Sequence, residues 1–217
     1  MNAEKPCTVI AIDDHPLFLK GVADLINLVD SLDLIGAAAS GQDGLDKAIE
    51  LKPDLILLDM NMKGMGGIET LEALKAADLD SRVVMLTVSD SEDHVVAAFR
   101  AGADGYLLKD MEPEDILERL QIAASGHFVI SDELTELLAH ALREDALPKS
   151  PSQAGLTERE EQILELISGG FSNKLIARKL DITEGTVKVH VKHMLKKLNL
   201  RSRLEAAVWA VNSKKDG

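Results

Sequence analysis

Short apolar runs alternate with amphipathic stretches over the first 125 residues of the chain. The apolar runs predict five strands, over Thr8–Ile12, Leu32–Ala38, Leu55–Leu58, Arg82–Thr87 and Gly105–Leu108. Helical periodicity predicts five helices between and after them, over Pro16–Val29, Gln42–Leu51, Gly67–Ala76, Glu92–Ala101 and Pro113–Ala124. Strands that alternate with helices in this way are typical of an α/β fold with a parallel sheet covered on both faces.

The last third of the chain shows helical periodicity only. Thr157 and Glu160 have capping-box spacing and predict a helix that ends at Gly169-Gly170. Further helices are predicted over Asn173–Leu180, Glu184–Leu198 and Arg203–Val211. A short helix, a tight turn and a longer basic helix are typical of the helix-turn-helix motif.

Residues 127–153 differ in composition from both parts. A short helix is predicted over Asp132–Leu142, followed by prolines among serine and charged residues, a mixture typical of a flexible tether. The predicted organisation is therefore a domain at 1–126, a linker with a short helix at 127–153, and an all-α domain at 154–217.

Charge divides the chain along the same boundary. Residues 1–148 carry 11 Lys and Arg against 29 Asp and Glu, a balance of −18, whereas residues 149–217 carry 13 against 8, a balance of +5. An acidic module joined to a basic one indicates nucleic-acid binding by the second. A single cysteine, the lack of an apolar leader and the lack of any apolar run of about 20 residues predict a cytoplasmic protein without a membrane span.

Charged side chains follow the predicted strands directly. Asp13 and Asp14 come after the first strand, Asp59 after the third and Lys109 after the fifth. Because parallel strands end at one edge of a sheet, these groups should meet where open α/β sheets place their sites. Clustered carboxylates are costly unless a divalent cation lies among them, and Mg2+ prefers such oxygen ligands.

This cluster predicts transfer of a phosphoryl group onto a carboxylate. Asp59 ends the most apolar strand and is the candidate nucleophile, with Asp13 and Asp14 holding Mg2+ beside it. Lys109 supplies positive charge to the phosphoryl group, and Thr87, which ends the fourth strand, supplies a hydroxyl to one phosphoryl oxygen.

Residues 8–125 resemble the receiver domain of bacterial two-component response regulators. The matching stretches are Ile12-Asp13-Asp14-His15, Leu58-Asp59-Met60-Asn61-Met62, Leu86-Thr87 and Gly105-Tyr106-Leu107-Leu108-Lys109. The resemblance implies a five-stranded parallel flavodoxin-like (CheY-like) fold. It also implies that a sensor histidine kinase phosphorylates Asp59.

The same resemblance implies further roles. Asp14 would bind Mg2+ directly, Asp13 through water, and Asn61 through its main-chain carbonyl oxygen. Thr87 and Tyr106 would form a switch pair, in which the hydroxyl moves toward the phosphoryl group and the ring turns inward.

Two positions depart from the family pattern. Lys63 stands where the family usually has proline, and Asp110 stands where proline commonly follows the lysine. Lys63 would loosen the loop after Asp59 and add a cation near it, which could speed phosphate loss or alter kinase docking. His15 is interpreted as a solvated histidine at a helix start, with metal ligation as the alternative.

The predicted helix Glu184–Leu198 has an apolar and a basic face. Its inward stripe consists of Val187, Val191, Met194, Leu195 and Leu198. The outward face carries Lys188, Lys192 and Lys196 at intervals of four, with Val189 and His193. Lysines can reach guanine edges or phosphates, and Val189 can touch a thymine methyl group. Phosphate contacts are expected from Thr183, Arg201 and Arg203. By itself, such a face also suits an ordinary amphipathic surface helix.

Leu156–Glu160, Asn173–Ala177 and Thr186–His190 resemble the four-helix LuxR/FixJ-type helix-turn-helix domain over residues 154–213. The chain is thus identified as a member of the NarL/FixJ family of response regulators, near its nitrate/nitrite-responsive members. The resemblance implies phosphorylation-dependent binding to promoter half-sites on duplex DNA, with the unphosphorylated receiver masking the recognition helix. It also implies a homodimer on DNA, with contacts from Ala206, Ala207, Val208 and Val211.

Two other functions stay open. A Mg2+-dependent phosphatase with an aspartate nucleophile needs a second acid two residues later, and that position is Asn61. Self-phosphorylation and self-dephosphorylation of Asp59 are therefore expected rather than enzymatic turnover. A protein-binding output would place the basic helix on an acidic partner. The salt dependence of binding to duplex DNA would separate the two functions, because several phosphate contacts give a steep slope of log affinity against log salt.

Overall fold

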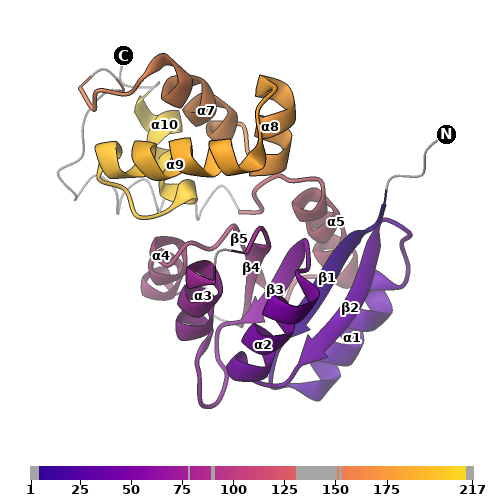
Figure 1. Ribbon diagram of the computed structural model, residues 1–217. Helices are drawn as coiled ribbons and strands as arrows, with labels where there is room; N and C mark the ends of the chain where they lie inside the picture. The colour runs from indigo at the N-terminus through magenta and orange to yellow at the C-terminus, as the bar shows by residue number, and fades with distance from the viewer. Residues whose placement is uncertain (1–4, 78, 89–90, 131–150, 152, 214–217) are drawn as a thin grey trace. The chain divides into compact units, whose positions relative to one another are not determined.

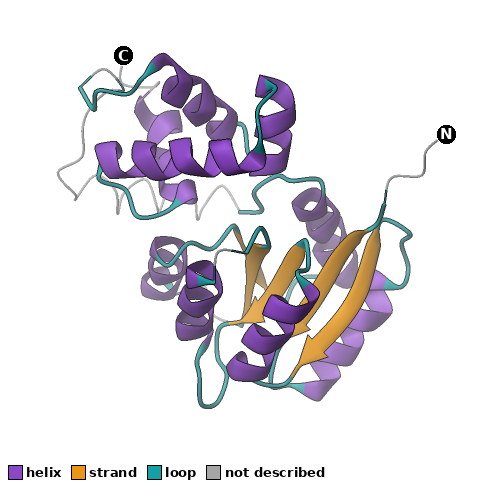
Figure 2. Cartoon of the chain, viewed as in Figure 1, coloured by secondary structure: helices purple, strands orange, loops and turns teal. Residues whose placement is uncertain are grey.

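The computed structural model describes residues 5–77, 79–88, 91–130, 151 and 153–213 (Figure 1). The chain divides into two compact units, Met1–Ser125 and Gly126–Gly217. In the first, helices cover a β-sheet, whereas the named elements of the second are all helices (Figure 2). The predicted linker helix over Asp132–Leu142 lies outside the described residues.

The sheet of the first unit has five strands in the order β2-β1-β3-β4-β5, and every neighbouring pair is parallel. The strands are β1 (Cys7–Ile12), β2 (Leu32–Ala38), β3 (Leu55–Asp59), β4 (Arg82–Thr87) and β5 (Gly105–Leu108). Every residue of β3 is buried, as expected for a central strand covered on both faces. The predicted five-stranded parallel sheet is confirmed.

Two layers of helices cover this sheet. The helices are α1 (Pro16–Ile26), α2 (Gly41–Leu51), α3 (Gly67–Ala76), α4 (Glu92–Arg100) and α5 (Pro113–Ala124). Helices α2, α3 and α4 lie on one face, while α1 and α5 lie together on the other (Figure 1). This is the arrangement that right-handed crossovers between parallel strands produce.

Helix α1 ends three residues earlier than the prediction. The apolar residues Leu28 and Val29 continue the helical pattern, but their amides bond to the carbonyl oxygens of Leu25 and Ile26, three residues back. The last turn is therefore tightened rather than α-helical, and Leu28 is left exposed.

Gly67 lets helix α3 begin directly against the end of β3. A Cβ atom at this position would collide with the main-chain carbonyl oxygen of Asp59. The Gly67 amide instead donates a hydrogen bond to the Met60 carbonyl oxygen over 3.0 Å. The close approach fixes the turn that follows Asp59.

The second unit consists of α7 (Glu158–Ser168), α8 (Asn173–Leu180), α9 (Glu184–Leu198) and α10 (Arg203–Ser213) in its described part. Their N-caps Thr157, Ser172 and Thr183 each accept a hydrogen bond from a main-chain amide of the first turn. The predicted helix-turn-helix layout is confirmed. Among helices of the described residues, none has the length and apolar character needed to cross a bilayer.

A buried acid ties helix α7 to helix α9. Glu160 is 3% exposed and completes the predicted capping box with Thr157. Its carboxylate also accepts a hydrogen bond from Lys197 over 2.7 Å. Burial alone would raise the pKa of Glu160, but the hydrogen bonds from Lys197 and Thr157 outweigh it and leave that pKa below its usual value.

Candidate functional site

Strand register brings the predicted acidic residues together at the carboxyl edge of the sheet. Ile12 on β1 pairs with Leu58 on β3, so the next residues, Asp13 and Asp59, are neighbours. At the other side of β3, the Lys109 amide donates to the Thr87 carbonyl oxygen over 2.7 Å. The alignment follows from parallel pairing of strands that each end at a polar residue.

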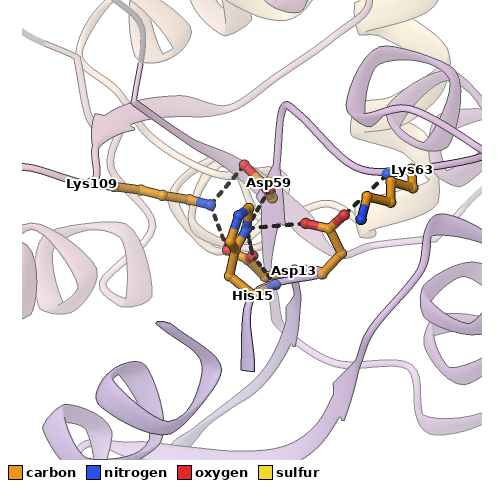
Figure 3. A network of polar contacts seen from close by, with 6 residues as sticks. Asp13, His15, Asp59, Lys63 and Lys109 are labelled. Carbon is orange, nitrogen blue, oxygen red and sulfur yellow. Dashed lines mark hydrogen bonds and ion pairs between the residues drawn. The ribbon is translucent and has the colours of Figure 1, made fainter. Parts of the chain in front are cut away.

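Lys109 bridges the two central carboxylates. Its Nζ lies 2.6 Å from Asp13 Oδ2 and 2.8 Å from Asp59 Oδ1, and Figure 3 shows its side chain pointing between them. Asp13 and Asp59 are 2% and 1% exposed, and the Lys109 side chain is 9% exposed. These short ion pairs, shielded from water, hold a positive charge at the Asp59 carboxylate.

Asp14 and His15 complete the acidic cluster. His15 Nδ1 lies 3.1 Å from Asp13 Oδ1 and 3.0 Å from Asp14 Oδ1. The His15 side chain is 67% exposed and precedes α1, in line with a solvated histidine at a helix start. Because its ring also reaches the carboxylates, the alternative of metal ligation stays open.

The cluster has the features of a cation site. Potential ligand atoms of Asp13, Asp14, His15 and Asp59 all lie within 4.8 Å of one another. One buried oxygen, Asp59 Oδ2, has no hydrogen-bond partner among the described residues, and the nearest nitrogen to it is His15 Nδ1 at 3.9 Å. Carboxylates that are shielded from water and this close together are costly without a cation, and oxygen donors suit Mg2+. The residues therefore fit the predicted metal.

The predicted switch residues are both buried. Thr87 is 0% exposed and ends β4 beside the acidic cluster. Tyr106 is 2% exposed, with its ring centroid 6.1 Å from that of Phe99. Asn61 lies in the exposed loop after Asp59, and the metal contact expected of its main-chain carbonyl stays a prediction.

The unusual Lys63 contributes to the site through its main chain. Its amide donates a hydrogen bond to Asp14 Oδ2 over 3.2 Å, while the residue itself is exposed (Figure 3). Proline, which the family usually has here, carries no N–H group and could not make this bond. The other departure, Asp110, is exposed.

Sequence reasoning missed one neighbour of the cluster. The Lys109 ammonium lies over the ring of Phe18, 4.6 Å from the ring centroid. Phe18 is in the first turn of α1 and looks like an ordinary member of that helix's apolar stripe, since it precedes the buried Val22 by four residues. Its only signal in the sequence was its closeness to the acid pair.

The second candidate site is the outer face of α9. Lys192, His193 and Lys196 are exposed there, together with Val189 at 53%. Lys188 is partly buried, and the predicted inward residues Val187, Met194 and Leu198 are buried. The predicted two-faced helix is therefore present, with basic groups and one apolar side chain facing solvent.

The three residues predicted to contact phosphates beside α9, Thr183, Arg201 and Arg203, have different surroundings in the structure. Thr183 Oγ1 accepts the Thr186 amide over 3.1 Å as the cap of α9, and Arg201 is exposed. The Arg203 guanidinium is engaged inside the unit, donating to Asn173 Oδ1 over 2.7 Å and to the Phe171 carbonyl oxygen. These partners lie at and just before the start of α8, so Arg203 ties the start of α10 to that region.

The expected dimer contacts on α10 lie mostly inside the fold. Ala206, Ala207 and Val208 are 0%, 6% and 4% exposed, whereas Val211 is 39% exposed. Helix α10 is apolar over most of its circumference and packs on α7, which covers these small residues. Of the four, only Val211 is exposed in the structure.

Comparison with known proteins identifies the family. The chain matches the response regulator receiver domain over residues 9–121 and bacterial regulatory proteins of the luxR family over residues 154–210. It is 52% identical over 209 residues to the nitrate/nitrite response regulator protein NarL of Escherichia coli (strain K12), which covers 96% of this chain and 97% of NarL. The chain belongs to the response regulator family.

Other response regulators match as well. The nitrate/nitrite response regulator protein NarP of the same strain is 43% identical, covering 96% of both chains. The receiver domain of the response regulator NarL from Mycobacterium tuberculosis has a TM-score of 0.54 and 34% identity, covering 56% of this chain and 98% of that one. A response regulator with a receiver and a LuxR-type DNA-binding domain was predicted, and that prediction is confirmed.

Proposed function

We propose that this response regulator binds promoter DNA when Asp59 is phosphorylated by a sensor histidine kinase. The observation that carries the proposal is the convergence of Asp13, Asp14, Asp59 and Lys109 at one sheet edge. Similarity to NarL and NarP supports nitrate or nitrite as the signal and the cytoplasm as the location. Residues 1–126 would form the receiver, 127–153 the linker and 154–217 the DNA-binding domain.

In the proposed reaction, a carboxylate oxygen of Asp59 attacks the donor's phosphorus. The new P–O bond forms as the P–N bond to the kinase histidine breaks, and the bonding electrons leave with the imidazole nitrogen. Lys109, already 2.8 Å from Asp59, would neutralise a phosphoryl oxygen, and the Thr87 hydroxyl would donate a hydrogen bond to another.

The acidic residues would hold Mg2+ during this transfer. Asp13, Asp14 and Asp59 offer carboxylate oxygens, and Asn61 would add its main-chain carbonyl oxygen. Bound there, the cation would neutralise charge on the carboxylates and on the incoming phosphoryl oxygens. Asn61, where an aspartate-nucleophile phosphatase needs an acid, supports a phosphoryl group that is stored and lost slowly rather than turned over.

A phosphoryl group adds roughly −1.5 to −2 charges at the pocket. We propose that Thr87 and Tyr106 respond to it and that the response reaches the DNA-binding domain. The opposite charges of the two parts, −18 and +5, support masking of the basic helix until phosphorylation occurs. Two copies would then bind adjacent half-sites.

An Asp59→Asn variant tests the phosphorylation step. Wild type, treated with acetyl phosphate and Mg2+, should gain the mass of one phosphoryl group and bind more tightly to a duplex selected from a randomised pool. Asp59→Asn should show neither change, while Asp33→Asn, at an exposed acid on β2, should behave as wild type. A gain in DNA affinity by treated Asp59→Asn would contradict the proposal.

The DNA interface is tested by salt dependence. The proposed contacts are Thr183, Lys188, Val189, Lys192, Lys196, Arg201 and Arg203. Removing the exposed Lys192 with alanine should make the slope of log affinity against log salt less steep by about one unit. Lys20→Ala, an exposed lysine on α1, should leave the slope unchanged. A slope near zero for wild type would favour the protein-binding output instead.

A further inference from the structure

The ammonium group of Lys109 has partners on three sides. Two are the carboxylates of Asp13 and Asp59, at 2.6 and 2.8 Å. The third is the ring of Phe18, whose centroid lies 4.6 Å from Nζ. Asp59 ends β3, Phe18 lies in α1 and Asp13 directly follows β1, so three separate parts of the fold converge on one cation.

The ring supplies a third partner to a cation that is largely shielded from water. An ammonium carries three N–H groups and no acceptor, so a buried lysine needs three partners or solvent. The Lys109 side chain is only 9% exposed. The negative face of an aromatic ring attracts a cation by about 0.5–1 kcal/mol at exposed sites and by about 2 kcal/mol when both are desolvated.

We propose that Phe18 is a positioning residue that holds Lys109 over the phosphoacceptor. This inference rests on the proposed function, in which Lys109 neutralises the phosphoryl group on Asp59. Phe18 would not touch that group. It would restrict the flexible four-carbon chain of Lys109 to conformations that keep Nζ near Asp59 and away from solvent.

A purely structural role for Phe18 makes a different prediction. Phe18 precedes Val22 and Ile26 on the same side of α1, so its ring could serve only as part of that apolar stripe. Leucine at this position would preserve the stripe but remove the aromatic face. Tyrosine would preserve the face. The two variants therefore separate packing from the contact with Lys109.

The contact itself is tested by NMR on the full chain without Mg2+. Protons that lie above the face of an aromatic ring are shifted upfield by its ring current. The ε-methylene protons of Lys109 should therefore resonate upfield of those of the other lysines. Phe18→Leu should abolish this shift and Phe18→Tyr should retain it. An unshifted Lys109 in wild type would overturn the proposal, whatever the kinetics show.

The role in phosphorylation is tested with acetyl phosphate, which needs no kinase docking surface. Phe18→Leu should slow phosphorylation of Asp59 roughly three- to tenfold, as expected for loss of a cation–ring contact, and Phe18→Tyr should restore the rate. Leu17→Ala is the matched control, because Leu17 is 87% exposed in the same turn. Its rate should equal that of wild type.

The outcomes distinguish this inference from the function on which it rests. A wild-type rate in Phe18→Leu, with wild type itself phosphorylated on Asp59, would overturn the positioning role and leave the proposed function standing. Equal slowing in Phe18→Leu and Phe18→Tyr would also overturn it, since the aromatic face would then be irrelevant. If wild type took no phosphoryl group, the proposed function would fail first.

Discussion

Asp59 in the first unit and Glu160 in the second are both almost fully buried, at 1% and 3% exposure, but their surroundings differ. Asp59 lies among other carboxylates and keeps one buried oxygen without a hydrogen-bond partner. Glu160 receives hydrogen bonds from Lys197 and from the Thr157 amide. A buried acid therefore belongs to a candidate reactive cluster in one unit and to a structural contact between helices in the other.

The two units also differ in whether their candidate functional groups are shielded from solvent or exposed to it. In the receiver, the side chains proposed to react lie at a shielded edge of the sheet, where a low dielectric would strengthen their interaction with a phosphoryl group. In the DNA-binding unit, the candidate contacts Lys192 and Lys196 are exposed on α9. A small ligand can enter a pocket, whereas a duplex must meet a convex surface.

The largest effect on stability is expected from substitution of Glu160. Glu160→Ala should lower the free energy of unfolding of the second unit by about 2–3 kcal/mol, because a helix cap and a buried charged hydrogen bond are lost together. Trp209, the single tryptophan, is buried in α10, so its fluorescence in urea reports on this unit. Glu161→Ala, at the exposed next position, should change the value by less than about 0.5 kcal/mol.

Acid titration sharpens this prediction. The pKa of Glu160 is lowered in the folded state. The carboxylate therefore stabilises the fold fully at pH values above its unfolded-state pKa, and this stabilisation is lost as the pH falls through its folded-state pKa. Wild type should therefore exceed Glu160→Gln in stability at neutral pH, and the difference should shrink in acid. A difference that stays constant down to low pH would contradict the assignment.

A change of opposite sign is expected in the receiver. Asp59→Asn should raise the free energy of unfolding of the first unit by about 1 kcal/mol, since it removes one of three crowded negative charges while keeping an acceptor for Lys109. The fluorescence of Tyr106, the single tyrosine and buried in this unit, follows the transition.

Two controls test whether crowding of the carboxylates causes the stabilisation expected for Asp59→Asn. Asp43→Asn, an exposed acid paired with Lys47, should leave stability within about 0.5 kcal/mol. Millimolar Mg2+ should stabilise wild type by mass action but have little effect on Asp59→Asn. Destabilisation of the first unit by Asp59→Asn would show that the acids are held by favourable partners, as Glu160 is.

The sequence predicted those parts of the fold that depend on local pattern. Strands β4 and β5 and helices α8 and α9 begin and end where expected, because each joins an apolar pattern to a clear stop such as Asp181 or Asn199. The end of α1 was missed, since Leu28 and Val29 have the right polarity for a helix but adopt a tighter turn. Polarity alone does not distinguish a hydrogen bond to the third residue back from one to the fourth, so the pattern could not locate this helix end.

The site was predictable where strand order alone determines it. Three acids and Lys109 follow strands that pair in parallel, so their meeting needed no side-chain detail. The contact of Phe18 with Lys109 and the internal engagement of Arg203 depend on how helices pack, which pattern does not encode. These features arise between residues far apart in the chain.

The smallest effect is expected from substitutions of Lys63, which should change the affinity for Mg2+ only slightly. Like Glu160, Asp14 accepts a hydrogen bond from a main-chain amide, that of Lys63, over 3.2 Å. Lys63→Pro should delete this bond and weaken Mg2+ binding, measured by calorimetry, by roughly threefold relative to Lys63→Ala, because one charged hydrogen bond of modest strength is lost.

Lys63→Ala is the proper reference, since it removes the exposed cation but keeps the amide. Its own affinity for Mg2+ should equal or slightly exceed that of wild type, because one positive charge has left the neighbourhood of a divalent site. If Lys63→Pro bound Mg2+ as tightly as Lys63→Ala, the amide would have no part in orienting Asp14. The loop after Asp59 would then tolerate lysine or proline equally, and Asp14 would lack the main-chain support that Glu160 has.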